Sequence, residues 1–250
     1  MNPDTLVAIS CYSGDTFRIE NALSVGLLTH HECPIVLLSP ADAPGVIPPF
    51  LSRSCGVRGT QGQESLDRWD GYFRMLLEFP QNNFLIIDSD SYCLTPELPK
   101  RFYDQPGVFW SYHCPEGRPH ASPYPKVAFQ SPMFLNREII EKLLSVDRSK
   151  VRAHPITPFQ DWYLVALACE SGVEYKHNPD AISYMGWNGG PEFPTDNFDL
   201  DASYLGGDRM VADVLSGKIL IHSVRHKYWL ERMIEAHQEY LQRRGRSIPC

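Results

Sequence analysis

Paired cysteines at the spacing of a metal or redox site are absent from this chain. Its seven cysteines are scattered, and no two form a Cys-x-x-Cys pair. Their odd number and irregular spacing do not suit a disulfide framework, so a reducing cytoplasm is the expected compartment. Cys11, Cys93 and Cys169 lie in apolar runs, and we expect them to be small core residues.

Long apolar runs are also missing, and we expect no leader segment. No stretch approaches the length that spans a bilayer. The polar start, Met1 to Asp4, leads directly into a predicted strand and has neither the basic nor the apolar region of a signal peptide. We therefore expect a cytoplasmic protein that acts on something reachable from the cytoplasm or from the inner face of a membrane.

An excess of positive charge is the third absence. The formal net charge of −7 gives no overall attraction to nucleic acid or to an anionic membrane. Basic residues gather only locally, at 225–227 and 243–246. We interpret the second group as a solvated chain end, with a contact to a membrane surface or a nucleic acid as the alternative. The hydrophobic content of 43% is typical of a soluble globular protein and excludes the disordered class.

Strand and helix patterns alternate in the first half of the sequence. Short apolar runs predict strands at 5–11, 34–38 and 83–88, and apolar residues at helical spacing predict helices at 15–28 and 63–79. This order implies a parallel sheet with right-handed crossovers. Ligands bind beyond the carboxyl ends of such strands, so the residues after the first and third strands should face one crevice.

The second half is less regular. Its patterns predict strands at 108–112, 127–135, 181–185 and 218–222, and helices at 136–144, 159–171 and 228–243. Pro132 is expected to break the second of these strands. A long loop rich in Gly, Pro and Asp at 186–201 is expected to be functional because of its length. No repeat or interdomain linker is evident, which favours one α/β domain.

Asp88-Ser89-Asp90 follows directly on four apolar residues, Phe84 to Ile87. An unpaired carboxylate at the end of a buried strand is costly, and a bound divalent cation would remove that cost. Mg²⁺ and Mn²⁺ prefer carboxylate oxygens and commonly share them with substrate phosphates. We expect this motif to hold a divalent ion, although two Asp residues that cap a turn are the alternative.

With this motif in place, the sequence resembles the GT-A glycosyltransferases. Five segments carry the likeness: 6–10, 63–79, 84–90, 159–162 and 219–222. The resemblance implies a GT-A-like, Rossmann-like mixed sheet flanked by helices, in a single catalytic domain over 1–250. Residues 1–94 would form the nucleotide-sugar-binding half and 95–250 the acceptor-binding half. It also implies Mn²⁺ or Mg²⁺ as cofactor and a nucleotide sugar, first of all a UDP-sugar, as donor.

The resemblance extends to a histidine near the end of the sequence. His222 ends a predicted strand, and in many GT-A enzymes a histidine at such a place is the third metal ligand, beside Asp88 and Asp90. Segment 222–229 is also similar to the His…Lys-Pro-Trp segment of glycogenin-like retaining transferases. It is one residue shorter, lacks the Gly and has Tyr228 in place of Pro. Lys227 or Arg225 would offset the charge of the leaving diphosphate. A histidine bonded to backbone is the alternative.

Donor contacts are implied at several further positions: Tyr12 and Ser13 for the base and ribose, Asp42 for the same groups, and Arg68 or Arg74 for the phosphates or the sugar. Ser89 would accompany Asp88 at the diphosphate. Solvated charges and turn formers are the alternative for each of them.

Asp161 is the candidate catalytic residue. Inverting GT-A enzymes often place a catalytic Asp at a helix start, where it deprotonates the acceptor hydroxyl. Here Gln160 stands where an acidic partner often occurs, and an Asp that stabilises the helix dipole is the alternative. Asp161 favours inversion of the anomeric centre and segment 222–229 favours retention, so the stereochemistry stays open.

Aromatic and small polar residues mark the predicted acceptor side: Trp110, Tyr112, His113, Trp187, Asn188 and Gly189. They suit a glycan or another hydroxyl-bearing acceptor, with a modified base in DNA as an alternative that a local basic groove would permit. A nucleotidyltransferase is a second hypothesis, but the Gly-rich phosphate loop of that class is missing after the first strand. A non-catalytic carbohydrate-binding or protein-binding domain is the third.

Overall fold

The computed structural model describes residues 4–10, 34–39, 51–54, 62–88, 92–93, 109–114, 127–152, 160–177, 181–183, 211–212, 214–216, 220–222 and 227–243. Helix 15–28, loop 186–201 and both ends of the sequence lie outside these residues. No helix in the described part is long and apolar enough to cross a membrane.

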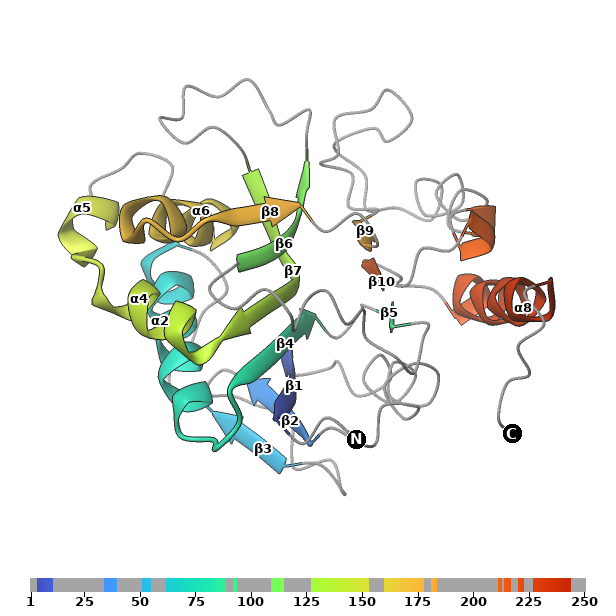
Figure 1. Ribbon diagram of the computed structural model, residues 1–250, viewed down its shortest axis with the longest axis horizontal. Coiled ribbons are helices and arrows are strands. Elements are labelled where there is room, and N and C mark those ends of the chain that lie inside the picture. The colour runs from blue at the N-terminus through green and yellow to red at the C-terminus, as the bar shows by residue number, and fades with distance from the viewer. Residues whose placement is uncertain are drawn as a thin grey trace.

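A seven-stranded sheet forms the centre of the molecule, with the strand order β3-β2-β1-β4-β7-β6-β8 (Figure 1). Its strands are β1 (Thr5–Ser10), β2 (Ile35–Ser39), β3 (Leu51–Ser54), β4 (Asn83–Asp88), β6 (Phe109–Cys114), β7 (Val127–Asn136) and β8 (Tyr175–His177). The first four are parallel to one another, as the sequence predicted for three of them. β7 runs antiparallel to both β4 and β6, and β8 is parallel to β6. The mixed sheet expected from the sequence is therefore confirmed.

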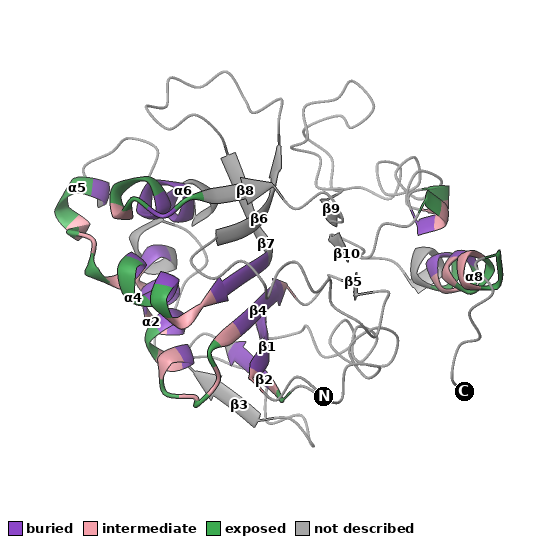
Figure 2. Ribbon diagram, in the orientation of Figure 1, coloured by how far each residue is buried: buried purple, intermediate pink, exposed green. Residues whose placement is uncertain are grey.

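Helices cover one face of this sheet. Figure 1 shows α2 (Gly62–Leu77), α4 (Arg137–Ser145), α5 (Arg148–Arg152) and α6 (Gln160–Ser171) gathered on one side of the strands. The strand residues on that face, such as Ala8 and Ile86, pack with Trp69 and Phe73 of α2. Val7, Leu85 and their neighbours on the other face are also buried, as Figure 2 shows for the inner strands. Burial on both faces explains why these strands are continuous apolar runs.

A second, three-stranded sheet lies beyond the tip of β4 (Figure 1). It consists of β5 (Tyr92–Cys93), β10 (Leu220–His222) and β9 (Ala181–Ser183), with β10 in the middle. α8 (Lys227–Arg243) lies on that side of the molecule, away from α2, α4, α5 and α6.

The predicted break at Pro132 is wrong, because β7 is continuous from Val127 to Asn136. The pairing is nevertheless irregular beside it: Ser111 pairs with Met133, whereas His113 pairs with Ala128. Proline has no N–H to give to a ladder, and such an irregular stretch does not require one.

Cys169 is exposed, so its expected place in the core is wrong. It lies one residue past Ala168, where the fully buried run in α6 ends. Desolvation of the thiol raises the pKa of Cys169, and the neighbouring carboxylate of Glu170 raises it further. The thiol therefore stays protonated at neutral pH and is a poor nucleophile.

Polar side chains fasten the amino ends of β1 and β4. The Asp4 carboxylate accepts hydrogen bonds from the backbone N–H and the side-chain amide of Asn82, at 3.0 and 2.9 Å. The guanidinium of Arg137 donates to the carbonyls of Leu77, Phe79 and Gln81, which satisfies the last turn of α2 and the chain that follows it. These contacts fix the positions of the amino ends of β1 and β4 relative to each other and to α2.

Candidate active site

Asp88 is the last residue of β4 and lies at the carboxyl edge of the sheet. It pairs with Ser10, the last residue of β1, one step beyond the pair Ile9 and Ile87. Ile87 is 1% exposed, and Asp88 is half-buried. The acidic motif therefore begins at the carboxyl end of the buried strand pair β1–β4.

In the small sheet, β10 pairs with β5, the strand that follows this motif in the sequence. Leu220 pairs with Cys93 and Ile221 with Tyr92, in antiparallel register. Along β10 the chain therefore runs back toward the motif, and Tyr92 lies two residues after Asp90. His222 stands at the motif end of β10, beside Ser183 of β9.

Two helices also begin at this edge. β8 runs in the same direction as β4, because β7 is antiparallel to β4 and to β6, and β6 is parallel to β8. α2 and α6 each lead into the amino end of one of these strands, so their first turns lie at the opposite, carboxyl edge. Asp161 is the second residue of α6 and is placed at the same edge as Asp88.

The pair β6–β7 extends past the end of β4. Met133 pairs with Ile86, and the pairs of Ala128 with His113 and of Val127 with Cys114 lie further along β7. This extension lies beyond the carboxyl end of β4, which is the end that Asp88 occupies. β9 contacts β6, and β10 contacts β7, so the two sheets meet around the same region.

Comparison with known proteins gives matches of fold. No family model and no curated protein matches the chain. The galactosyltransferase LgtC, solved with donor and acceptor sugar analogs, matches with a TM-score of 0.54 at 12% identity, over 98% of this chain and 97% of that one. A glycosyltransferase involved in the glycosylation of the major capsid of PBCV-1 matches with a TM-score of 0.50 at 14% identity, over 94% and 100%. The glycosyltransferase GlyE of Streptococcus pneumoniae TIGR4 matches with 0.50 at 13%, over 98% and 65%.

The chain has the GT-A fold. Such low identities extend the likeness to the arrangement of strands and helices, and not to donor or acceptor. In this GT-A fold, the edge that carries Asp88 and the motif end of β10 is the edge where ligands of α/β sheets bind.

Carboxylate oxygens are ligands that Mg²⁺ and Mn²⁺ prefer. Asp88 ends β4, and His222 ends β10, whose partner β5 follows the acidic motif in the sequence. Within the residues that the structure describes, no three His, Cys, Asp or Glu side chains are grouped to hold a metal. Asp90 and the side chain of His222 lie outside the described residues, so this absence does not concern the predicted set of three.

Arg68 is a buried residue of α2, which rules out the solvated charge considered for it. It is 7% exposed, and its guanidinium carbon lies 5.9 Å from the ring centroid of Tyr72. An arginine over an aromatic face is held by a cation–π contact. Arg74, the other candidate on this helix, is exposed.

The remaining candidates are only partly within the described residues. Tyr12, Ser13, Asp42, Ser89 and Asp90 lie outside them, as do Trp187, Asn188 and Gly189. Lys227 is the first residue of α8, and Trp110, Tyr112 and His113 belong to β6; their side chains are not described.

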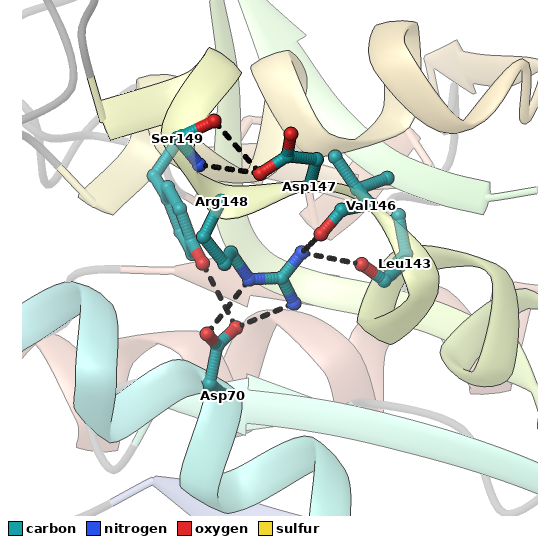
Figure 3. A network of polar contacts seen from close by, with 7 residues as sticks. Asp70, Leu143, Val146, Asp147, Arg148 and Ser149 are labelled. Carbon is teal, nitrogen blue, oxygen red and sulfur yellow. Dashed lines mark hydrogen bonds and ion pairs between the residues drawn. The ribbon is translucent and has the colours of Figure 1, made fainter.

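A polar network inside the helical layer was not predicted from the sequence (Figure 3). The Asp70 carboxylate, on α2, accepts hydrogen bonds from Nε and Nη2 of Arg148 at 2.8 and 2.9 Å. It also accepts one from the Tyr163 hydroxyl of α6 at 2.8 Å. Nη1 of Arg148 donates to the carbonyls of Leu143 and Val146, so α2, α4, α5, α6 and the turn between α4 and α5 are joined.

One signal in the sequence could have revealed this network. Leu66, Asp70 and Phe73 follow one another at helical spacing, so the acidic residue falls within the apolar stripe of α2. A carboxylate in such a stripe requires partners from other elements. The sequence does not reveal which residues those are, because Arg148 and Tyr163 are far away along the chain.

Proposed function

We propose that the chain is a metal-dependent glycosyltransferase that moves a sugar from a nucleotide sugar to a hydroxyl group of a glycan or another acceptor. A UDP-sugar is the first candidate for the donor. The observation that supports this most is the pairing of β10 with β5. It returns His222 toward Asp88-Ser89-Asp90 at the ligand-binding edge of a GT-A sheet. Neighbours of the same fold include an enzyme solved with donor and acceptor sugar analogs.

In this proposal Asp88, Asp90 and His222 hold Mn²⁺ or Mg²⁺, which when bound neutralises charge on the diphosphate. Ser89 and Lys227 provide further contacts to the same phosphates. Residues 1–94 form the donor half, where Tyr12, Ser13 and Asp42 meet the base and ribose. Arg68, in the second turn of α2 with its guanidinium carbon 5.9 Å from the Tyr72 ring centroid, is the proposed contact with the donor sugar or phosphates.

Residues 95–250 form the acceptor half in this proposal, with Asp161 as general base. The acceptor oxygen forms a bond to the anomeric carbon, and the bond from that carbon to the diphosphate oxygen breaks. The diphosphate leaves with the electron pair, and the hydroxyl proton passes to the Asp161 carboxylate. A glycan is the first acceptor class to test, and a modified base in DNA is the second. The proposal includes a cytoplasmic location, because the scattered cysteines suit a reducing compartment.

Thermal unfolding with a panel of nucleotide sugars tests the donor and the metal. We expect a UDP-sugar with Mn²⁺ to raise the unfolding midpoint of the wild type, because a ligand that binds the folded state stabilises it. Asp90→Ala should lose this rise and keep its midpoint without ligand. The matched control is Glu138→Ala, an exposed residue of α4, which should respond like the wild type. If no nucleotide sugar with metal shifts the wild type, the proposed donor site is wrong.

The released product identifies the reaction class. Nucleoside diphosphate is expected from glycosyl transfer, whereas pyrophosphate would indicate a nucleotidyltransferase. Proton NMR of the anomeric centre of the product then decides between inversion and retention. Absence of any product from a protein that binds the donor would favour a binding domain.

A further inference from the structure

The Asp70–Arg148–Tyr163 network fixes the relative positions of the helices that it joins. Asp70 is buried, with a side chain 6% exposed, and Arg148 is 17% exposed. Both carboxylate oxygens of Asp70 and all three nitrogens of the Arg148 guanidinium take part in its bonds. A buried ion pair commonly adds little stability over apolar side chains of the same volume, so stability alone does not account for it. Bidentate pairing does fix the relative position of the groups that it joins.

The network fixes the first turn of α6. Tyr163 is the fourth residue of that helix, two residues after Asp161, and it is completely buried. Its hydroxyl is held by the Asp70 carboxylate, and its ring lies 5.9 Å from the guanidinium carbon of Arg148. A helical turn is stiff, so anchoring Tyr163 sets both the height and the rotation of the turn that carries Asp161.

The same network reaches the helix that leads into the acidic motif. Asp70 belongs to α2, and six residues after the end of α2 the chain enters β4, which ends at Asp88. The carboxylate of Asp70 therefore links the helix ahead of the donor motif with the helix of the predicted base. In transfer chemistry a misplacement of about 1 Å between reacting groups costs on the order of a hundredfold in rate.

We propose that Asp70, Arg148 and Tyr163 are positioning residues, which hold the first turn of α6 at the height that brings Asp161 to the acceptor hydroxyl. This role rests on the proposed function. The Tyr163 arm of the network acts on the acceptor side of the reaction, because α6 carries the proposed base, whereas the proposed metal ligands lie outside α6 and the donor contact Arg68 lies on α2. Loss of the anchor should therefore impair transfer to the acceptor more than hydrolysis of the donor, in which water attacks the anomeric carbon.

Tyr163→Phe tests the role, because it removes one hydroxyl and retains the buried ring. The probes are UDP-glucose and UDP-galactose with Mn²⁺, and a panel of methyl glycosides as acceptors. We expect the ratio of transfer rate to hydrolysis rate to fall about tenfold, with the KM for the donor within about twofold of wild type. Hydrogen exchange in the second turn of α6, whose N–H groups bond to the carbonyls of the first turn, should become faster, as local opening would require.

Arg137→Met is the matched structural control. Arg137 satisfies three carbonyls at the end of α2, at the amino edge of β4, and Asp88 lies a full strand length of about 16 Å away. This variant should lower the unfolding midpoint at least as much as Tyr163→Phe and leave the transfer-to-hydrolysis ratio unchanged. If Tyr163→Phe does not fold, Arg148→Lys takes its place, since an ammonium keeps a positive charge beside Asp70 and loses the bidentate geometry; the same fall in the ratio is expected.

The outcomes separate the two proposals. An unchanged ratio in Tyr163→Phe, or an equal change in both variants, overturns the positioning role and leaves the proposed function standing. A wild type that neither transfers nor hydrolyses any nucleotide sugar overturns the proposed function, and the positioning role with it.

Discussion

At the scale of single residues, two ion pairs on neighbouring helices show how burial decides the value of a charge. The pair of Arg148 and Asp70 is largely buried and shares its atoms with a tyrosine and two carbonyls. The pair of Lys142 and Glu138 joins the same kinds of groups at 2.7 Å, with side chains 51% and 61% exposed. Water competes for the second pair and hardly reaches the first.

Removal of one partner should therefore have very different effects. Arg148→Met leaves the Asp70 carboxylate buried without its cation, and we expect a loss of about 3–5 kcal/mol in the free energy of unfolding. Glu138→Gln should cost no more than about 0.5 kcal/mol. Urea unfolding followed by circular dichroism measures both. Similar losses in the two variants would mean that the Asp70 network is open to water.

At the scale of elements, α6 ends in a defined cap. Gly172 has a φ of +69°, its N–H donates to the carbonyl of Cys169, and the N–H of Val173 donates to that of Ala168. This is the Schellman arrangement, which ends a helix at a residue in the left-handed conformation. The cap turns the chain at once into β8, so it sets where the last strand of the large sheet begins.

Gly172→Ala is expected to lower the free energy of unfolding by about 1 kcal/mol. No atom lies within 4 Å of where the new Cβ would be, so the cost comes from the backbone conformation and not from a clash. Gly172→Asn should cost less, because Asn tolerates the left-handed region. Urea unfolding of both variants decides; an unchanged Gly172→Ala would mean that the turn relaxes to another conformation.

The elements also show what a sequence can reveal. β4 runs from Asn83 to Asp88 as predicted, because a continuous apolar run bounded by polar residues defines its own limits. The short strands β3, β5 and β8 and the short helix α5 were not predicted, since they depend on neighbours more than on local pattern. Asp88 could be placed at the carboxyl edge of the large sheet because it ends a predicted strand, and His222 was assigned to the same site through the resemblance. The partners of Asp70 could not be predicted, because they are set only by packing.

At the scale of the whole molecule, the strands of both halves share one sheet. β4 comes from the first half of the proposed division and β7 from the second, and they pair from Asn83 to Ile86. α2 and α6 pack on the same face and enter the same core. A division into donor and acceptor halves therefore describes function in the proposal and not independent folding.

We expect a single cooperative unfolding transition. Tryptophan fluorescence and far-ultraviolet circular dichroism should give the same midpoint in urea, because one core connects the two halves. Trp69, fully buried in that core, is one of the fluorescent reporters. Two separate transitions would show that residues 1–94 fold apart from the rest.

The pairing of β10 with β5 affects when the proposed metal site can form during folding. Ile221 and Tyr92 are about 130 residues apart in the sequence, and a contact of such span forms late, because the loop it closes costs entropy that only the finished pairing repays. During synthesis the acidic motif leaves the ribosome long before the histidine that is proposed to complete its metal site. A nascent chain would therefore stay inert toward its donor until its last strand is in place.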